Sequence, residues 1–440
     1  MRGALATALL LILAALPAGA QSYRFSLEEA VAYGVQNSTA IRSKALALEA
    51  ARQDLAGARA AMYPSLSAGL TYTHLYPQPE FSGFPAGATD PLGLTANLSQ
   101  SIYTFGKLKG GVKLAEQAVT QARLDLEEET RQLVVLVKRA FFGYLLALEV
   151  QGINRETLDR KREALEVARL RYGAGQVSDY EVLRAESDLE NYRATVIGSD
   201  NAVRIALLNV RGALGIQEEE FEFQLVGQLE PLAFSLDRKA LLARALQRKY
   251  ELASLRGSMD LLAAQAALNR SLALPSLVGF MAYSLDSGMD AEGKNDYFNA
   301  EAWDGRWTAG FSFSVPVSAL FPWSKESAAV RKSALQLENM RQQYSSLESG
   351  VRIVVESGLL KIAGEEAKIA SGRKSLNLAQ RLYESADVQY RSGYISSTDL
   401  KDAQLGLNGA QLALAQAVFG YNQNVLDLLD AAGLDGEENQ

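Results

Sequence analysis

The residue types that most often do chemistry in proteins are scarce in this chain of 440 residues. It contains no cysteine and a single histidine, His74, which excludes disulfides, thiolate metal sites and cysteine nucleophiles and disfavours zinc sites with several nitrogen ligands. The glycine-containing run at residues 106–111 lacks the spacing of a phosphate-binding loop, and the glutamates at residues 127–129 are predicted to lie on a solvated helix face. We therefore expect no enzymatic activity, no cofactor and no bound metal.

Acidic residues outnumber basic ones, and their distribution bears on the partners of the chain. The 44 lysines and arginines against 51 aspartates and glutamates give a net charge of −7, without a basic stripe, so nucleic acid is not expected as a partner. Asp399 and Asp402 stand three positions apart at the start of a predicted helix, which places both carboxylates on one face near the positive end of the helix dipole. This pair can either stabilise the helix terminus or present negative charge to a pore.

Two long segments without proline, residues 92–230 and 323–440, indicate that very long helices hold these residues. Small or apolar side chains recur about every 3.5 residues from Lys107 to Arg171, which is the spacing of supercoiled helices, and residues 325–389 repeat the pattern. At ~1.5 Å per residue, each such helix extends about 100 Å. Each is followed by a short glycine-containing turn and a returning helix, at residues 179–214 and 398–432.

Four shorter segments alternate apolar and polar residues with a period of two, which predicts β-strands with one apolar face. They are residues 65–73, 94–102, 276–284 and 307–315, of which the third alternates least regularly. Such strands of about ten residues are typical of a transmembrane β-barrel, with lipid on one side and a polar lumen on the other. Four strands cannot close a barrel, since the smallest barrels have about eight, so several chains must share one. Two copies would supply eight strands and three copies twelve.

The chain also repeats itself. A shift of 218 positions superimposes Lys107 on Lys325, and a shift of 211 positions superimposes Pro64 on Pro275. We therefore predict a tandem duplication in which each half contains a helix, two strands and a long helical hairpin. The first of these helices is predicted at residues 26–62, beginning with a capping sequence.

The N-terminus has the composition of an export signal, with Arg2 before an apolar run and a small-residue cleavage site at residues 17–20. The apolar run is shorter than the ~20 residues of a membrane-spanning helix. The sequence thus divides into a signal peptide at 1–20, a first repeat at 21–216, a linker at 217–234, a second repeat at 235–434 and a C-terminal tail at 435–440.

Several motifs occur in this duplicated order. They are Ser26-Leu27-Glu28-Glu29-Ala30-Val31, Tyr63-Pro64-Ser65-Leu66 with its echo Leu274-Pro275-Ser276-Leu277, the strand-to-helix join at 101–107, and the turns at 171–178 and 389–396. In these motifs the chain resembles the TolC family of outer-membrane efflux and secretion channels over essentially its whole mature length. The resemblance implies a mainly α fold with a membrane β-barrel part. In that fold three chains form a homotrimer, whose long helical hairpins build an α-barrel continuous with a 12-stranded β-barrel of four strands per chain.

The resemblance also implies roles for the turns and for the acidic pair. The two turns would lie at the periplasmic tip and contact a periplasmic adaptor protein through Gly175, Val177, Ser178, Gly393, Ile395 and Ser396. Asp399 and Asp402 match the aspartates with which the family rings its closed periplasmic entrance. Some relatives carry a basic latch residue near the second turn, where this chain has Tyr394-Ile395-Ser396, and Arg391 is offset from that position. Whether an entrance latch exists is therefore left open.

Together these features predict a passive exit duct in the outer membrane, with its helical barrel in the periplasm and lipid around its β-barrel. An inner-membrane transporter would supply the energy, as part of a tripartite efflux or type I secretion system, and the sequence leaves the cargo open. The alternative is a periplasmic coiled-coil scaffold without a pore, which would have no reason for alternating strands such as residues 307–315.

Overall fold

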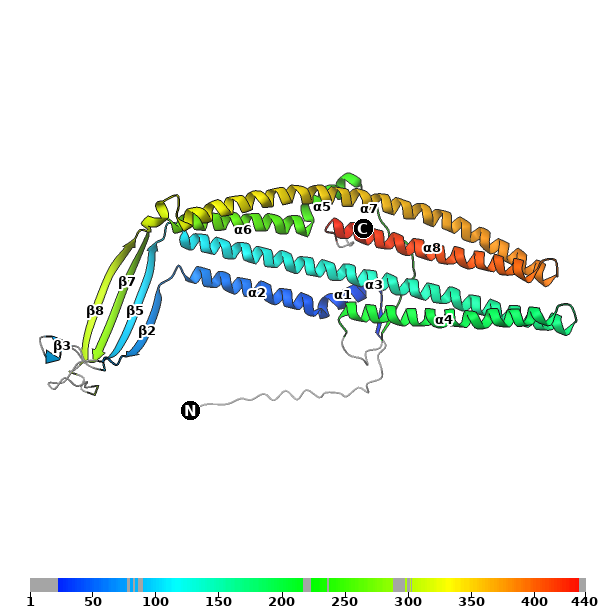
Figure 1. Ribbon diagram of the computed structural model, residues 1–440, viewed down its shortest axis with the longest axis horizontal. Helices are drawn as coiled ribbons and strands as arrows, with labels where there is room; N and C mark the ends of the chain where they lie inside the picture. The colour runs from blue at the N-terminus through cyan, green and yellow to red at the C-terminus, as the bar shows by residue number, and fades with distance from the viewer. Residues whose placement is uncertain are drawn as a thin grey trace, which may run out of the picture.

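The computed structural model describes residues 23–76, 80–81, 84–85, 90–216, 223–235, 237–287, 297–298, 301 and 303–434. The predicted signal peptide at 1–20 and C-terminal tail at 435–440 lie outside the described residues, as does part of the predicted linker. Figure 1 shows an elongated molecule with a sheet at one end and long helices along the rest of its length. Within the described ranges, no helix is long and apolar enough to cross a membrane.

Both halves of the chain build two short helices, two strands of the main sheet and a long helical hairpin. The first half contains β1 (Tyr23–Phe25), α1 (Leu27–Asn37), α2 (Thr39–Ala60), β2 (Ser65–Tyr72), β3 (Glu80–Phe81), β4 (Phe84–Pro85), β5 (Leu92–Tyr103), α3 (Lys107–Gly173) and α4 (Asp179–Leu214). The second contains β6 (Phe223–Leu225), α5 (Arg238–Arg248), α6 (Tyr250–Leu272), β7 (Ser276–Ser287), β8 (Trp303–Ser314), the 3-10 turn η2 (Val317–Leu320), α7 (Lys325–Arg391) and α8 (Ser397–Ala431). The same order of elements recurs in the two halves.

The long helices α3 and α7 have 67 residues each and begin at the predicted positions. They end at Gly173 and Arg391, two residues beyond the predicted ends. At ~1.5 Å per residue, each is about 100 Å long, in agreement with the prediction from the absence of proline.

The first predicted helix, at residues 26–62, is wrong in one respect, because the structure divides it into α1 and α2 at Ser38. The backbone of Ser38 is extended, with φ −65° and ψ 120°, and its hydroxyl accepts a hydrogen bond of 3.2 Å from the Ile41 amide. Ser38 therefore acts as the N-cap that starts a second helix. The glycine that ends α4, Gly215, lies at this break, where a Cβ on it would stand 3.5 Å from the Asn37 carbonyl oxygen.

The four predicted strands form one antiparallel sheet in the order β2-β5-β7-β8, and the last three are longer than predicted. The register places residues of like polarity in rows across the sheet. One row contains Ala68, Ala96, Tyr283 and Trp307, and the adjacent row on the opposite face contains Gly69, Thr95, Ser284 and Arg306. The predicted division into an apolar and a polar face is thus present across all four strands.

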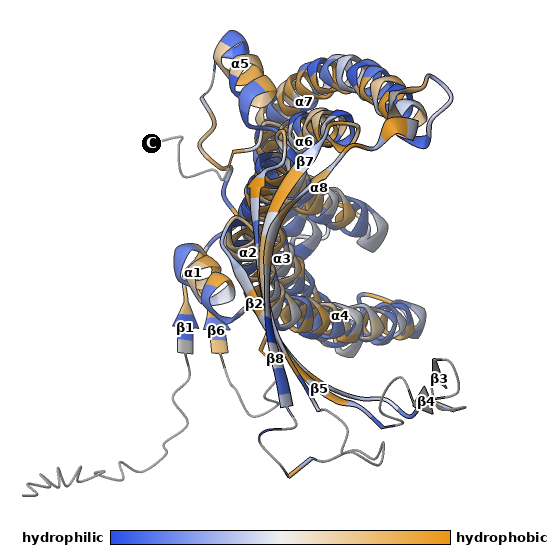
Figure 2. Ribbon diagram, turned by 90° about the vertical axis from the view of Figure 1, so that its left-hand side faces the viewer, coloured by the Kyte–Doolittle hydropathy of each residue, from blue (hydrophilic) through white to orange (hydrophobic). Residues whose placement is uncertain are grey.

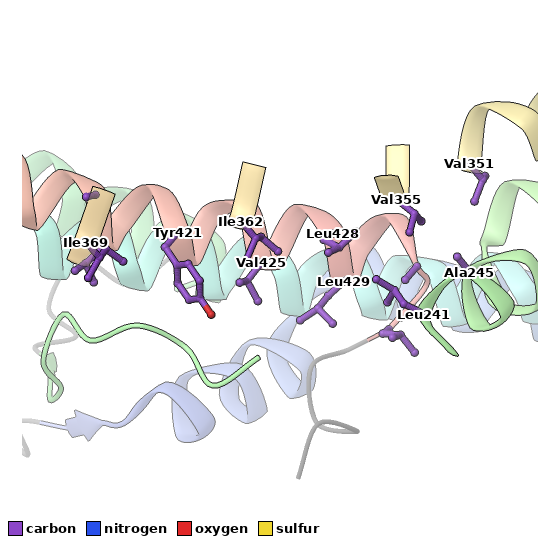
Figure 3. Close-up of a cluster of buried hydrophobic side chains, with 14 of the residues drawn as sticks. Leu241, Ala245, Val351, Val355, Ile362, Ile369, Tyr421, Val425, Leu428 and Leu429 are labelled. Atoms are coloured by element: carbon purple, nitrogen blue, oxygen red, sulfur yellow. The ribbon is translucent and has the colours of Figure 1, made fainter. Parts of the chain in front are cut away.

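Two buried clusters fix the helices around the middle of the molecule. One joins α5, α7 and α8 through side chains such as Val355, Tyr421 and Leu428 (Figure 3). The other joins α1, α3 and α4 with β1 and β6, which pair in parallel. The fully buried Asn422 of α8 ties the linker to these helices, since its side chain bonds the Glu230 carbonyl and the Leu232 amide at 2.8 Å each.

The long helices form an open arc, not a closed bundle (Figure 2). Near the sheet, α3 packs on α2 and α6, and α6 packs on α7. Towards the far end, α3 packs on α4 and α8, and α8 packs on α7. One edge of the arc is thus formed by α7 and the other by α2 and α4, while α3 lies in the interior.

Candidate functional site at the helical tips

The turns that end the two long helices have the same backbone geometry. Gly175 and Gly393 have φ values of +70° and +81°, in the left-handed region that glycine adopts without a steric penalty. The Gly175 and Gln176 amides donate to the carbonyls of Tyr172 and Arg171 at 2.9 Å each, which defines a Schellman motif, and the second turn repeats this pattern. Val177 and Ile395 follow these glycines and are half-buried.

The returning helices begin differently. The Ser396 hydroxyl accepts from the Asp399 amide at 3.2 Å, and the Asp399 carboxylate accepts from the Ser396 amide at 3.0 Å, which is a complete capping box. The Ser396 hydroxyl, which donates to the Asp399 carboxylate at 2.7 Å, and the Ser396 amide together lower the pKa of Asp399 below its ordinary value of 3.8. At the start of α4, Ser178 occupies the same position, but its side chain forms no capping hydrogen bond.

The two acidic residues predicted at the entrance therefore differ in their surroundings. The carboxylate of Asp399 is exposed but already serves the helix terminus. Asp402 is exposed one turn later, and its carboxylate forms no hydrogen bond or ion pair with any residue that the structure describes. The sequence allowed two roles for this pair, helix stabilisation or negative charge at a pore. In the structure Asp399 stabilises the start of the helix, and Asp402 has no such role.

Polar contacts join the start of α8 to α4 of the same chain. Lys401 Nζ lies 2.8 Å from Asp188 Oδ1, with both side chains about one-third exposed. The Ser397 hydroxyl donates to Glu181 Oε2 at 2.7 Å. A third contact, from the Arg184 guanidinium to Thr398 Oγ1, measures 3.2 Å. These contacts hold the tips of the two hairpins together.

Arginines at the ends of α3 and α7 add to this connection. The Arg171 guanidinium donates to the carbonyl oxygens of Tyr390 and Arg391, the latter at 2.9 Å, and lies 4.5 Å from the centre of the Tyr390 ring. A cation at the C-terminal end of α7 is favourable, because the helix dipole is negative there. Arg391 bonds Asp387 at 2.9 Å and approaches Glu163 of α3 at 3.8 Å.

Lys161 of α3 lies beside the Lys401–Asp188 pair, in a small cavity between α3, α4 and α8. Its burial lowers the pKa of the Lys161 ammonium, and the nearby Asp188 carboxylate opposes that effect. Among the described residues, no group of three or more histidines, cysteines, aspartates or glutamates is arranged to hold a metal ion.

The residues that connect the hairpins were not identified from the sequence. Arg171, Arg184 and Lys401 are ordinary charged positions on helices, and Lys401 is 213 residues away from Asp188 along the chain. No local pattern indicates which of many surface charges will meet after two hairpins dock. The positions around Ile395, where the sequence left a latch open, hold Tyr394-Ile395-Ser396 without a basic residue, and the contacts described above lie in the same region.

The chain was compared with known proteins. It matches the family model described as outer membrane efflux protein over residues 35–216 and 241–434. It is 23% identical over 410 residues to the outer membrane protein TolC of Escherichia coli strain K12, which covers 91% of this chain and 80% of TolC. The alkaline protease secretion protein AprF of Pseudomonas aeruginosa is 23% identical over 339 residues, 74% of this chain and 66% of AprF.

Solved structures show the same fold. The Campylobacter jejuni CmeC outer membrane channel superimposes with a TM-score of 0.75 at 18% identity, over 92% of this chain and 85% of CmeC. The outer membrane protein VceC of Vibrio cholerae gives a TM-score of 0.74 at 16% identity, over 92% of this chain and 96% of VceC. Because the family model covers most of the sequence, the chain belongs to the outer membrane efflux protein family, whose members are outer-membrane channels and not enzymes, as the sequence predicted.

Proposed function

We propose that three copies of the chain close a 12-stranded β-barrel in the outer membrane, continuous with an α-barrel in the periplasm. The four-stranded sheet supports this assembly, because it has one apolar and one polar face and each of its outer strands, β2 and β8, is paired on one side only within the described chain. Closure with other copies removes both free edges and places the apolar rows against lipid. In this assembly the repeats at 21–216 and 235–434 each supply two strands and one hairpin.

The tips of the hairpins would form the periplasmic entrance. The observation that carries this proposal is the exposed carboxylate of Asp402, one turn beyond the capped Asp399 at the tip farthest from the sheet (Figure 1). In three copies, Asp399 and Asp402 present six carboxylates to a narrow opening, which attracts cations and repels anions. The closed state is held by the contacts between α4 and α8 described above.

The entrance opens when an adaptor protein and an inner-membrane transporter engage the tips. The adaptor contacts the two glycine turns, at Gly175, Val177, Ser178, Gly393, Ile395 and Ser396, where a half-buried apolar side chain follows each glycine. The pore itself is passive, and the transporter supplies the energy. Relatives are named both as efflux proteins and as a protease secretion protein, so the proposed duct serves either efflux or protein secretion.

Single-channel recording in planar bilayers tests this function. We expect the mature chain to form a trimer in detergent and to give a mostly closed, cation-selective conductance. D402N is expected to lower cation selectivity several-fold, because it removes three charges from the entrance without removing a helix cap. A trimer in which D402N and D399N leave selectivity unchanged would contradict the acidic entrance, and a non-conducting chain would contradict the channel.

A further inference from the structure

Basic residues gather on the helices next to the sheet, although the whole chain carries a net charge of −7. Two turns of each of α2, α3, α6 and α7 adjoin the sheet (Figure 1), and two turns span about 10 Å. These turns contain seven basic residues against two acidic ones, so their balance of charge is opposite to that of the chain. We call the five exposed cations among them the basic collar: Arg59, Lys109, Lys113, Arg270 and Arg331.

The collar residues of α3 lie on the outer side of the helical arc. Lys109 and Lys113 are followed 28 positions later, which is four heptads, by Val137 and Phe141. Residues separated by whole heptads lie on the same side of a supercoiled helix. Val137 and Phe141 pack in the buried cluster with α1, β1 and β6, and these elements lie on the convex side of the arc (Figure 2). The two lysines therefore point away from the concave interior.

The other collar residues extend this arrangement to both halves of the chain. The Arg59 guanidinium of α2 lies 3.0 Å from the carboxylate of Glu116, which belongs to the same exposed stripe of α3 as the two lysines. Arg270 corresponds to Arg59 under the shift of 211 positions, and Arg331 corresponds to Lys113 under the shift of 218 positions. Each half thus places basic residues at the same level below the sheet.

Within the residues that the structure describes, four of the five collar cations have no ionic partner, and the exception is Arg59. The Arg331 guanidinium donates to one backbone carbonyl before α7 at 2.6 Å and keeps donors for a further acceptor. At the opposite end of the sheet acidic residues prevail, since Asp286 and Asp304 are opposite each other on β7 and β8, beside Arg306. The unpaired positive charge is therefore a feature of the end of the sheet that joins the helices.

Exposed aromatic side chains lie between the sheet and the collar. Phe321 and Trp323, just before α7, stack with their ring centroids 4.8 Å apart, and Trp323 is 80% exposed. Tyr103 and Phe105, between β5 and α3, form a second exposed pair at 4.5 Å. Tryptophan and tyrosine favour the boundary between lipid and water, so in the proposed barrel these pairs mark the membrane boundary. The headgroup layer beyond the hydrocarbon is about 5–8 Å deep, which is the depth of the collar.

We propose that the basic collar binds the anionic headgroups of phospholipids in the periplasmic leaflet of the outer membrane. The stems of lysine and arginine lie along apolar surface while their charged ends reach the phosphates, and arginine can donate two hydrogen bonds to one phosphate. The occupant is a lipid surface, because the collar adjoins an aromatic boundary and a sheet with an apolar face, whereas an acidic protein would require only the charge. The inference rests on the proposed membrane barrel and adds the class of lipid that surrounds one of its ends.

Lipid retention measures this preference. The mature chain is reconstituted in vesicles of equal parts phosphatidylglycerol and phosphatidylethanolamine and extracted in mild detergent, and its retained lipids are counted by native mass spectrometry. We expect phosphatidylglycerol to be enriched about fivefold or more, which is the effect of about one basic residue near an anionic surface. K109Q/K113Q/R331Q is expected to remove most of this enrichment.

The matched control is K361Q/K374Q/R381Q, which removes the same residue types from exposed positions of α7 that form no ion pair within the described chain. These positions lie about 50 Å or more along α7 from the sheet, beyond the reach of the headgroups. The control is therefore expected to retain the enrichment of the unmodified chain.

The unmodified chain supplies a second measurement that needs no variant to fold. Its enrichment in phosphatidylglycerol is expected to fall several-fold between about 50 and 500 mM NaCl, because salt screens the attraction between exposed charges. A conducting trimer without this preference, or with equal preference in the collar variant and the control, overturns the basic collar and leaves the proposed channel intact. A chain that neither forms trimers nor conducts overturns both.

Discussion

At the residue scale, the acidic pair shows how one sequence feature divides into two roles. The carboxylate of Asp399 accepts hydrogen bonds from the Ser396 amide at 3.0 Å and from the Ser396 hydroxyl at 2.7 Å, so it stabilises the start of α8. The carboxylate of Asp402 is exposed and lacks such contacts in the described chain. The role of either residue in ion selectivity stays a prediction.

The capping box makes the start of α8 sensitive to acid. The hydrogen bonds from Ser396 lower the pKa of Asp399, so its stabilising contribution is complete above the ordinary value of 3.8 and is lost as the pH falls through the lower pKa of the folded chain. We expect amide hydrogen exchange in the first turn of α8, corrected for intrinsic rates, to accelerate over this range. The start of α4 is the internal control, because Ser178 forms no side-chain cap there. Equal acceleration at both helix starts would contradict this account.

At the element scale, each returning helix ends against the junction between two short helices. Gly215, which follows α4, lies against the break between α1 and α2, and Gly433, which follows α8, lies against the break between α5 and α6. Both glycines have positive φ, of +71° and +67°. The predicted single helix at 26–62 had to be interrupted for this docking to occur. The alanine-rich sequence does not predict this interruption. Helix propensity depends on the residues of the segment itself, whereas the interruption accompanies docking of another helix.

The two docking glycines provide a matched pair of substitutions. A Cβ on Gly433 would stand 2.7 Å from the Arg248 carbonyl oxygen, whereas one on Gly215 would stand 3.5 Å from the Asn37 carbonyl oxygen. We expect G215A to cost about 1 kcal/mol of unfolding free energy, from the left-handed backbone alone. G433A is expected to cost about 1–3 kcal/mol more, because backbone must move. Thermal unfolding of the two variants measures these losses. Equal losses of stability would contradict a close contact between Gly433 and the Arg248 carbonyl oxygen.

At the scale of the whole molecule, the proposed closed state depends on ion pairs between hairpins that are only partly buried. Lys401 and Asp188 are about one-third exposed, so salt screens their attraction. Exposed pairs of this kind contribute about 0.2–1 kcal/mol each. Three copies would therefore favour the closed entrance by about 0.6–3 kcal/mol in total, which corresponds to roughly 3- to 150-fold in the closed–open equilibrium.

This estimate gives a conductance prediction. At low salt, D188N is expected to shift the closed–open equilibrium towards the open channel by a factor within that range. The open probability of D188N is then expected to increase much less with ionic strength than that of the unmodified channel. R193Q is the control, because Arg193 pairs with Glu190 on the same helix at 2.8 Å and joins no second hairpin. The charge-swapped variant D188K/K401D is expected to restore the closed state. A wild-type channel whose open probability does not respond to salt would exclude this latch.

The sequence by itself determined the duplication, the length of the helices, the faces of the strands and the family. These follow from local properties: the absence of proline over long stretches, the period-two alternation at residues such as 307–315, and two constant shifts between the halves. The tertiary structure decided the break at Ser38, the engagement of Asp399 by Ser396, and the pairing of Lys401 with Asp188. Periodicity along one segment specifies which of its faces is buried. It does not specify which of several hundred other residues will pack against that face. That choice is made only when the hairpins dock.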